Sequence, residues 1–308
     1  MKIAIMGTGG VGGYYGGLLA GAGHDVAFIA RGAHLRAIRE NGLEVRSVFG
    51  DFRVQPAAVT DDPSYVGPVE LVIFATKTYQ IAEAARAILP MVGPDTVVLP
   101  LQNGIDAADL IGEAIGAKHV LGGVTYLSAA VEGPGIIGHY SQFRRIIVGE
   151  FDGEITERVN SVCRVLNSTG ATVEAVGNIV QLLWTKFVFI SAISALGGLT
   201  RVTTGEYRDI PETRKMLTDA LREVIAIAFA RGLHLEPDLV EKTLQFVDGA
   251  SADMKPSMQR DIEAGRRCEL ESMIGIVVRL GVELKVPVPV MTVAYAALKP
   301  GEMKAASH

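Results

Sequence analysis

Short, almost continuous apolar runs alternate with amphipathic stretches through the first half of the chain. The pattern predicts strands at residues 2–6, 25–30, 69–75, 96–101 and 120–126, with helices at 12–22, 33–41, 80–89 and 107–115. Residues 43–54 alternate around a Gly-Asp pair and predict a hairpin insertion. Apolar strands separated by helices are typical of a parallel sheet covered on both faces, and right-handed crossovers make such a sheet doubly wound.

The pattern changes after a helix predicted at 154–168 and a short strand at 171–175. From residue 178 onward the periodicity is helical, with helices predicted at 178–196, 212–231, 237–249, 257–265, 269–285 and 289–298. Asn178 and Asp209 are the predicted N-caps of two of these helices, and the polar tail 299–308 is expected to fray. The predicted fold class is α/β: a doubly wound parallel sheet over 1–177, followed by an all-α C-terminal domain over 178–308.

A G-x-G-x-x-G motif, Gly7-Thr8-Gly9-Gly10-Val11-Gly12, stands directly after the first strand and before the first helix. In that context Gly7 permits the tight turn, Gly9 lets a pyrophosphate approach the backbone, and Gly12 allows close helix–strand packing. The motif therefore predicts an N-terminal Rossmann-type domain that binds a dinucleotide. A glycine-rich turn without a ligand is the weaker alternative.

The residue at the end of the second strand indicates which dinucleotide binds. NAD sites usually carry an acid there, which accepts from the ribose 2′-hydroxyl. This chain has Arg31, whose guanidinium can pair with a 2′-phosphate through two charge-assisted bonds. NADP(H) is the predicted cofactor; the alternative is a solvated loop arginine, since Arg36 and Arg39 are close by.

Composition excludes several other classes of protein. The 308 residues are 49% apolar and 20% charged, with a net charge of −5, which argues against a nucleic-acid or anionic-membrane partner. Cys163 and Cys268 lack the spacing of a disulfide framework or zinc site, and the histidines lack metal-ligand spacing, so no metal is expected. The start lacks signal-peptide features, and the apolar run 187–199 is too short to cross a bilayer. We expect a cytoplasmic protein, and the apolar helices of the second half are compatible with a homodimer.

Lys186 lies in a stretch that is apolar all round, Leu182-Leu183-Trp184-Thr185-Lys186-Phe187-Val188-Phe189-Ile190. An ammonium in a buried helix must reach solvent along its aliphatic stem, pair with a carboxylate, or serve a cleft. A desolvated lysine can donate a proton to a developing alkoxide, which reduction of a carbonyl by hydride requires. From this segment alone, the proton donor and the snorkelling lysine remain equal alternatives.

Further short motifs follow in a fixed order: Ala75-Thr76-Lys77, Gln102-Asn103-Gly104, Leu183-Trp184-x-Lys186, Pro256-Ser257-Met258-x-x-Asp261, Gly265-Arg266 and Glu269. Together with the glycine-rich turn, they give a chain that resembles the ketopantoate reductases (2-dehydropantoate 2-reductases) over residues 1–298. The resemblance implies NADPH-dependent reduction of 2-dehydropantoate to pantoate on the route to coenzyme A. It also implies a Rossmann domain and a helical domain with the active site in the cleft between them.

The resemblance implies roles for individual residues. Lys186 is the expected proton donor to the ketone oxygen, and Glu269 is expected to contact cofactor or substrate and to help hold Lys186. Asn103 is expected near the nicotinamide ribose and the substrate. Lys77 and Ala129 are expected to line the cofactor site, and Ser257 to bind the substrate carboxylate. Each also has a purely structural explanation, such as a turn at Asn103 or a helix start at Ser257.

The chain departs from the family where amides commonly read the substrate. One and two turns after Lys186 stand Ile190 and Ser194, Thr204 precedes Gly205-Glu206, and Ile274 precedes Gly275. We therefore expect a more apolar pocket, with Ser194 as a remaining polar substrate contact. Ketopantoate reduction is the first prediction; the alternatives are a paralogue that reduces another 2-oxo acid and a non-catalytic NADPH sensor.

Overall fold

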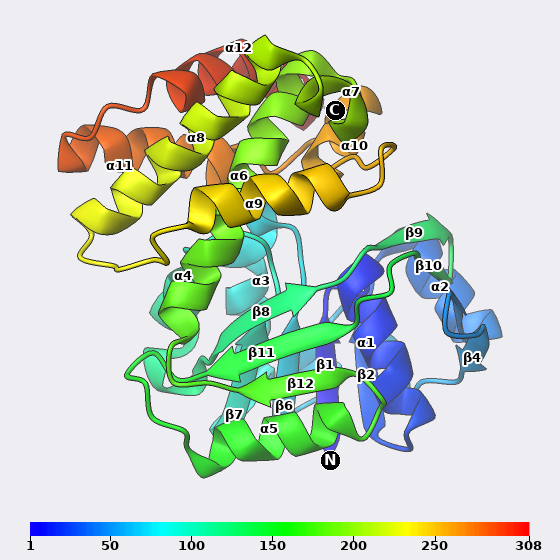
Figure 1. The fold of residues 1–308 in the computed structure, drawn as a ribbon. Coiled ribbons are helices and arrows are strands. Elements are labelled where there is room, and N and C mark those ends of the chain that lie inside the picture. Colours follow the sequence, from blue (N-terminus) through cyan, green and yellow to red (C-terminus); the bar gives the residue numbers. More distant parts are fainter. Residues whose placement is uncertain (308) are drawn as a thin grey trace. The chain divides into compact units, whose positions relative to one another are not determined.

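The computed structural model describes residues 1–307, which form two compact units (Figure 1). The first unit contains Met1–Gln102 and Asp106–Val180. The second contains Asn103–Ile105 and the chain from Gln181 onward. The sequence prediction separated the domains after residue 177.

A five-stranded parallel sheet forms the centre of the first unit. Its strand order is β5 (Ala58–Thr60), β2 (Asp25–Ile29), β1 (Lys2–Met6), β6 (Val69–Phe74) and β7 (Val92–Pro100). Helices α1 (Gly10–Gly21), α2 (Gly32–Asn41) and α3 (Ile81–Ala87) lie in the connections between these strands, and α4 (Ala107–Ile115) follows the last of them, β7. The predicted Rossmann-type parallel sheet is confirmed.

Alternate residues of β1 face two different cores. Ile3 and Ile5 pack with residues of α1 and α2, whereas Ala4 and Met6 pack with residues of α3 and α4. Because successive strand side chains point to opposite faces, this segregation shows that the two helix pairs cover opposite faces of the sheet. The sheet is doubly wound, as the continuous apolar strands predicted.

Two smaller sheets complete the first unit. One has the order β12 (Thr172–Ala175), β11 (Arg145–Gly149) and β8 (Gly122–Tyr126), and α5 (Glu157–Asn167) covers it in Figure 1. The other has the order β4 (Phe52–Val54), β3 (Leu43–Ser47), β10 (Ile136–His139) and β9 (Ala129–Gly133). The hairpin predicted at 43–54 is confirmed, since β3 and β4 pair antiparallel. Short helical turns lie at η1 (Pro63–Tyr65), η2 (Thr78–Gln80), η3 (Leu89–Met91) and η4 (Ala117–His119).

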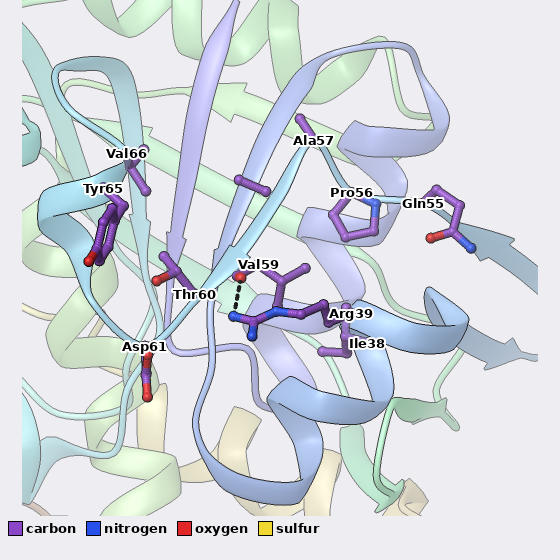
Figure 2. Close-up of a pocket in the computed structure, with 11 residues that line it drawn as sticks. Ile38, Arg39, Gln55, Pro56, Ala57, Val59, Thr60, Asp61, Tyr65 and Val66 are labelled. Atoms are coloured by element: carbon purple, nitrogen blue, oxygen red, sulfur yellow. Dashed lines mark hydrogen bonds between the residues drawn. The ribbon is translucent and has the colours of Figure 1, made fainter.

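The edge strand β5 lies beside a hollow of about 540 Å³, shown in Figure 2. Thr60 bonds toward β2, so the carbonyl of Val59 points to the open side of the strand. Arg39 of α2 donates to that carbonyl at 3.0 Å, which caps an otherwise exposed strand edge. The hollow shares no lining residue with the pocket at the glycine-rich turn described below.

The second unit is helical. Its helices are α6 (Ile179–Thr200), which begins at the end of the first unit, α7 (Thr204–Arg208), α8 (Pro211–Ala230), α9 (Leu239–Gly249), α10 (Ser257–Glu263), the π-helical segment η5 (Glu271–Gly275), α11 (Ile276–Leu284) and α12 (Pro289–Ala306). At 22 residues, α6 extends beyond the apolar run noted in the sequence and is long and apolar enough to cross a membrane. Because 56% of its most apolar window is buried within the protein, α6 also has the character of a core helix.

Two local predictions in the second unit are wrong. The tail expected to fray is helical to Ala306, with Pro300 inside α12. The carboxylate of Glu271 accepts from the Tyr295 hydroxyl at 2.8 Å and from the Lys299 ammonium, and these contacts hold the helix around the proline. The N-cap predicted at Asp209 is instead Ile210, because Asp209 follows the short helix α7.

Candidate active site

Packing within the protein explains three of the four glycines in the turn after β1. Gly7 has φ +95°, and a Cβ there would lie 2.8 Å from the backbone nitrogen of Thr76. A Cβ on Gly10 would lie 2.4 Å from the carbonyl oxygen of Ala129, and one on Gly12 would lie 2.1 Å from the carbonyl oxygen of Gly7. Real Cβ atoms do not tolerate such distances, so the folded chain itself requires glycine at these positions.

Gly9 is different, because the protein leaves open space beside it. A Cβ on Gly9 would meet nothing within 4 Å among the described atoms, and its φ of −85° suits any residue. Gly9 is the N-cap of α1 and, being glycine, has no side chain that could cap the helix. The first N–H groups of α1 therefore remain for an anion, at the positive end of the helix dipole.

A pocket of about 210 Å³ adjoins the glycine-rich turn. The ends of β1, β2 and β6 and the starts of α2 and α3 line it, with residues Met6, Gly7, Thr8, Ile29, Ala30, Arg31, His34, Thr76, Gln80, Glu83 and Ala84. The Thr8 hydroxyl and backbone N–H both donate to the carbonyl of Ile29, at 3.0 and 3.2 Å, and fix the turn to the end of β2. The pocket thus lies at the carboxyl ends of parallel strands, where doubly wound sheets bind their ligands.

Buried polar atoms near this end of the sheet lack partners within the described chain. The Oγ1 of Thr76 and both amide atoms of Gln102 are buried and make no hydrogen bond to residues 1–307. Buried polar groups in native proteins are normally paired, so these atoms indicate contacts that a ligand or solvent makes.

Most of the cofactor residues predicted from the sequence lie in the first unit, whereas Asn103 and Glu269 belong to the second. Arg31 is the N-cap of α2, and its exposed guanidinium pairs with the Glu83 carboxylate of α3 at 2.8 Å. Lys77 is the half-buried N-cap of η2, three residues after the end of β6. Ala129 begins β9 and lies against Gly10.

The second unit contains the candidate proton donor. Lys186 is half-buried in α6 between Trp184 and Phe187, which are 4% and 1% exposed. Burial lowers the pKa of Lys186 from 10.5 to about 8, and the negative charge of Glu269 acts in the opposite direction. Glu269 is itself buried and comes just before η5, so elements far apart in the sequence place the two charges within electrostatic reach.

The other predicted residues are distributed around the second unit. Ser194 lies two turns after Lys186 on α6 and is 1% exposed, and Ser257 is the half-buried first residue of α10. Asn103 follows β7 and groups with the second unit. Metal chemistry has no candidate centre, because no group of three His, Cys, Asp or Glu side chains within residues 1–307 is arranged to hold an ion.

At three positions where the family commonly has an amide side chain, this chain has an apolar residue or a hydroxyl that lies beside another hydroxyl. Ile190 is half-buried on α6, and Ile274 is fully buried in η5. The Thr204 hydroxyl is also buried and lies 3.1 Å from the hydroxyl of Tyr207.

Among the pocket residues that the sequence did not indicate as site residues, His34, Gln80 and Glu83 carry side chains that can hydrogen-bond or pair with a ligand. His34 follows Arg31 in the first turn of α2, and Glu83 is the acidic residue in the first turn of α3. The sequence could have indicated them by their positions at predicted helix starts, because helix starts surround the ligand site in this fold.

Comparison with known proteins assigns the chain to a family. A family model described as "Ketopantoate reductase PanE/ApbA" matches residues 3–153, and one described as "Ketopantoate reductase PanE/ApbA C terminal" matches residues 178–302. The chain belongs to the ketopantoate reductase family.

Individual relatives span almost the whole chain. A 2-dehydropantoate 2-reductase from Halobacterium salinarum is 32% identical, over 94% of this chain and 95% of the relative. An uncharacterized oxidoreductase of Bacillus subtilis, YkpB, is 29% identical over 97% and 98%. A crystal structure of a PanE/ApbA family ketopantoate reductase from Ralstonia eutropha superposes with a TM-score of 0.92 at 31% identity and covers 100% of both chains. The ketopantoate reductase family is one of oxidoreductases that act on small molecules with a nicotinamide cofactor.

Substitutions of Gly9 and Gly12 test whether the two glycines serve different purposes, with Gly12 needed for folding and Gly9 for binding the cofactor. Gly12→Ala forces a Cβ against a backbone oxygen, and we expect it to lower the free energy of unfolding by about 2 kcal/mol or more. Gly9→Ala meets open space, so we expect a change within about 1 kcal/mol but at least about ten-fold weaker NADPH binding. Urea unfolding and fluorescence titration measure the two effects. Unchanged NADPH affinity in Gly9→Ala would contradict the assignment of this turn to the pyrophosphate.

Proposed function

We propose that this chain is an NADPH-dependent 2-dehydropantoate 2-reductase. The observation that carries the proposal is Lys186, an ammonium with its pKa lowered to about 8 by burial in α6 and under the influence of buried Glu269. A proton donor near neutral pH is the group that carbonyl reduction needs. Membership of the ketopantoate reductase family supports ketopantoate as the substrate.

The residues of the first unit fit a nicotinamide dinucleotide. The open space beside Gly9 and the uncapped start of α1 suit the pyrophosphate, and Arg31 suits the 2′-phosphate of NADPH. The unpartnered atoms of Thr76 and Gln102 suit polar groups of the same ligand. Lys77 and Ala129 are further proposed contacts, as is Asn103, which groups with the second unit. When bound, the reduced nicotinamide supplies the hydride.

The second unit supplies the proton. As hydride adds to the 2-keto carbon, the carbonyl oxygen becomes negatively charged, and Lys186 stabilises it and transfers a proton from Nζ to it. Glu269 keeps Lys186 protonated in its apolar surroundings, because its charge favours the ammonium form. Ser257 is assigned to the substrate carboxylate and Ser194 to a further polar contact. The neutral lysine regains its proton from solvent before the next turnover.

A second candidate function is reduction of a more apolar 2-oxo acid by the same chemistry. The buried Ile274, the half-buried Ile190 and the engaged Thr204 hydroxyl favour it, since a pocket without partners for a substrate hydroxyl selects against substrates that carry one. A non-catalytic NADPH sensor is the third alternative. Location in the cytoplasm, a role on the route to coenzyme A and a homodimer stay predictions.

Substitution of the proton donor distinguishes enzyme from sensor. We expect Lys186→Ala to lower kcat for 2-oxo acid reduction by at least about 10²-fold, because it removes the general acid, and to retain NADPH binding. Lys304→Ala, an exposed lysine on α12, is the matched control and should leave kcat unchanged. NADPH oxidation is followed with ketopantoate, 2-oxoisovalerate and phenylpyruvate as substrates. A parent protein that turns over none of the panel supports the sensor, whereas a preference for the apolar acids supports the second candidate.

The pH dependence follows from the pKa of Lys186. The lysine must be protonated to donate, so kcat/KM for reduction should be constant below about pH 8 and fall about ten-fold per pH unit above it. Glu269→Gln removes a charge that raises this pKa, and the break should move to lower pH. Glu283→Gln, an exposed carboxylate on α11, is the control. If Glu269→Gln leaves the break where it is in the parent, Glu269 does not act on Lys186.

A further inference from the structure

Two oppositely charged side chains, one from the start of α2 and one from the first turn of α3, line the pocket beside the glycine-rich turn. The cation is Arg31 and the carboxylate is Glu83. The Nη2 of Arg31 lies 2.8 Å from Oε1 of Glu83. The pair is solvent-exposed, with 61% and 68% of the two side chains accessible, so a ligand can compete for either member.

The charges of the pocket lining cancel. Its titratable side chains are Arg31, Glu83 and His34. The backbone N–H of Gly135 donates to Nδ1 of His34 at 3.0 Å, and burial lowers the pKa of this histidine, so it is neutral at neutral pH. One guanidinium and one carboxylate remain, with a net formal charge of zero.

This balance works against a 2′-phosphate. A phosphate monoester carries about −1.5 to −2 charges at pH 7, and Arg31 is the cation of the lining that can pair with it. Glu83 already occupies one end of the Arg31 guanidinium. A phosphate on the remaining N–H groups therefore lies close to a like charge, which weakens its binding.

The same carboxylate suits the ribose of NADH. Dinucleotide sites that take NAD place an acid beside the ribose 2′-hydroxyl, usually at the end of the second strand. In this chain that position is Arg31, and an acid reaches the pocket from α3 instead. Resting on the proposed function, we propose that Glu83 is a specificity-determining residue that weakens the preference for NADPH over NADH by sharing Arg31 with the 2′-phosphate.

Nucleotide fragments test this without any substrate. The purified full chain is titrated at pH 7.5 with adenosine 2′,5′-bisphosphate and with adenosine 5′-monophosphate, which differ by the 2′-phosphate. Glu83→Gln keeps the size of the side chain and an oxygen that accepts from Arg31 but removes the charge. We expect it to tighten binding of the bisphosphate by about three- to five-fold, the order of one charge interaction at a solvent-exposed site, and to leave the monophosphate within about 1.5-fold.

Two variants control the comparison. Glu113→Gln removes an exposed carboxylate from the neighbouring helix α4, outside the pocket, and should change neither affinity. Arg31→Ala should abolish discrimination between the two nucleotides. In turnover assays, the ratio of kcat/KM for NADPH to that for NADH should rise in Glu83→Gln by the same factor as the affinity ratio.

Three results with the variants overturn the inference. They are an unchanged affinity for the bisphosphate in Glu83→Gln, an equal gain for both nucleotides, and a gain of the same size in Glu113→Gln. Binding of neither nucleotide to the parent also overturns it. The proposed reductase function fails by a different result: nucleotide binding as described here, but no oxidation of NADPH or NADH with any 2-oxo acid.

Discussion

Burying the ammonium of Lys186 among apolar neighbours costs free energy, and the buried carboxylate of Glu269 in the second unit offsets part of that cost. Helix α6 carries Lys186 in the same turn as the buried residues Trp184 and Phe187, and loss of solvation by burial favours the neutral amine. The charge of Glu269 opposes this effect and brings the balance to a pKa of about 8. Glu269 stands just before the π-helical segment η5, an irregularity that recurs at functional sites. A lysine that exchanges its proton near neutral pH is the result, and the proposed reduction depends on it.

In the glycine-rich turn of the first unit, some glycines are required by packing within the protein and one is required by the proposed ligand. Gly7, Gly10 and Gly12 are glycines because neighbouring backbone atoms leave no room for a side chain. Gly9 has room, so a ligand that approaches the backbone is the remaining reason for glycine there. The charges in the adjoining pocket bear on the choice between NADPH and NADH. Arg31 and Glu83 pair at 2.8 Å in this pocket, and in the function we propose Arg31 binds a 2′-phosphate while Glu83 weakens that binding.

Local patterns in the sequence predicted the features that depend on short segments. The apolar runs of β1, β2, β6 and β7 predicted the parallel sheet that the structure shows, and the glycine spacing predicted a turn that binds a dinucleotide. Features set by distant residues were not predictable in this way. Glu83 lies 52 positions from Arg31, and strands β9 and β10, which bring Ala129 to Gly10, are short and contain little apolar periodicity. The final turns of α12 looked like a fraying tail because the contacts of Glu271 with Tyr295 and Lys299 are tertiary. The chemistry of Lys186 stayed open from its own segment, since the opposing charge comes from Glu269.

A direct titration of Lys186 tests the central claim most sharply. NMR spectra of the protein with 13C-labelled lysine side chains, compared with those of Lys186→Met, assign the Cε resonance of Lys186. Our account predicts a titration midpoint at about pH 8, below that of the exposed lysines. A midpoint near the ordinary value of 10.5 would show that the ammonium is solvated, and it would contradict the assignment of Lys186 as a desolvated proton donor.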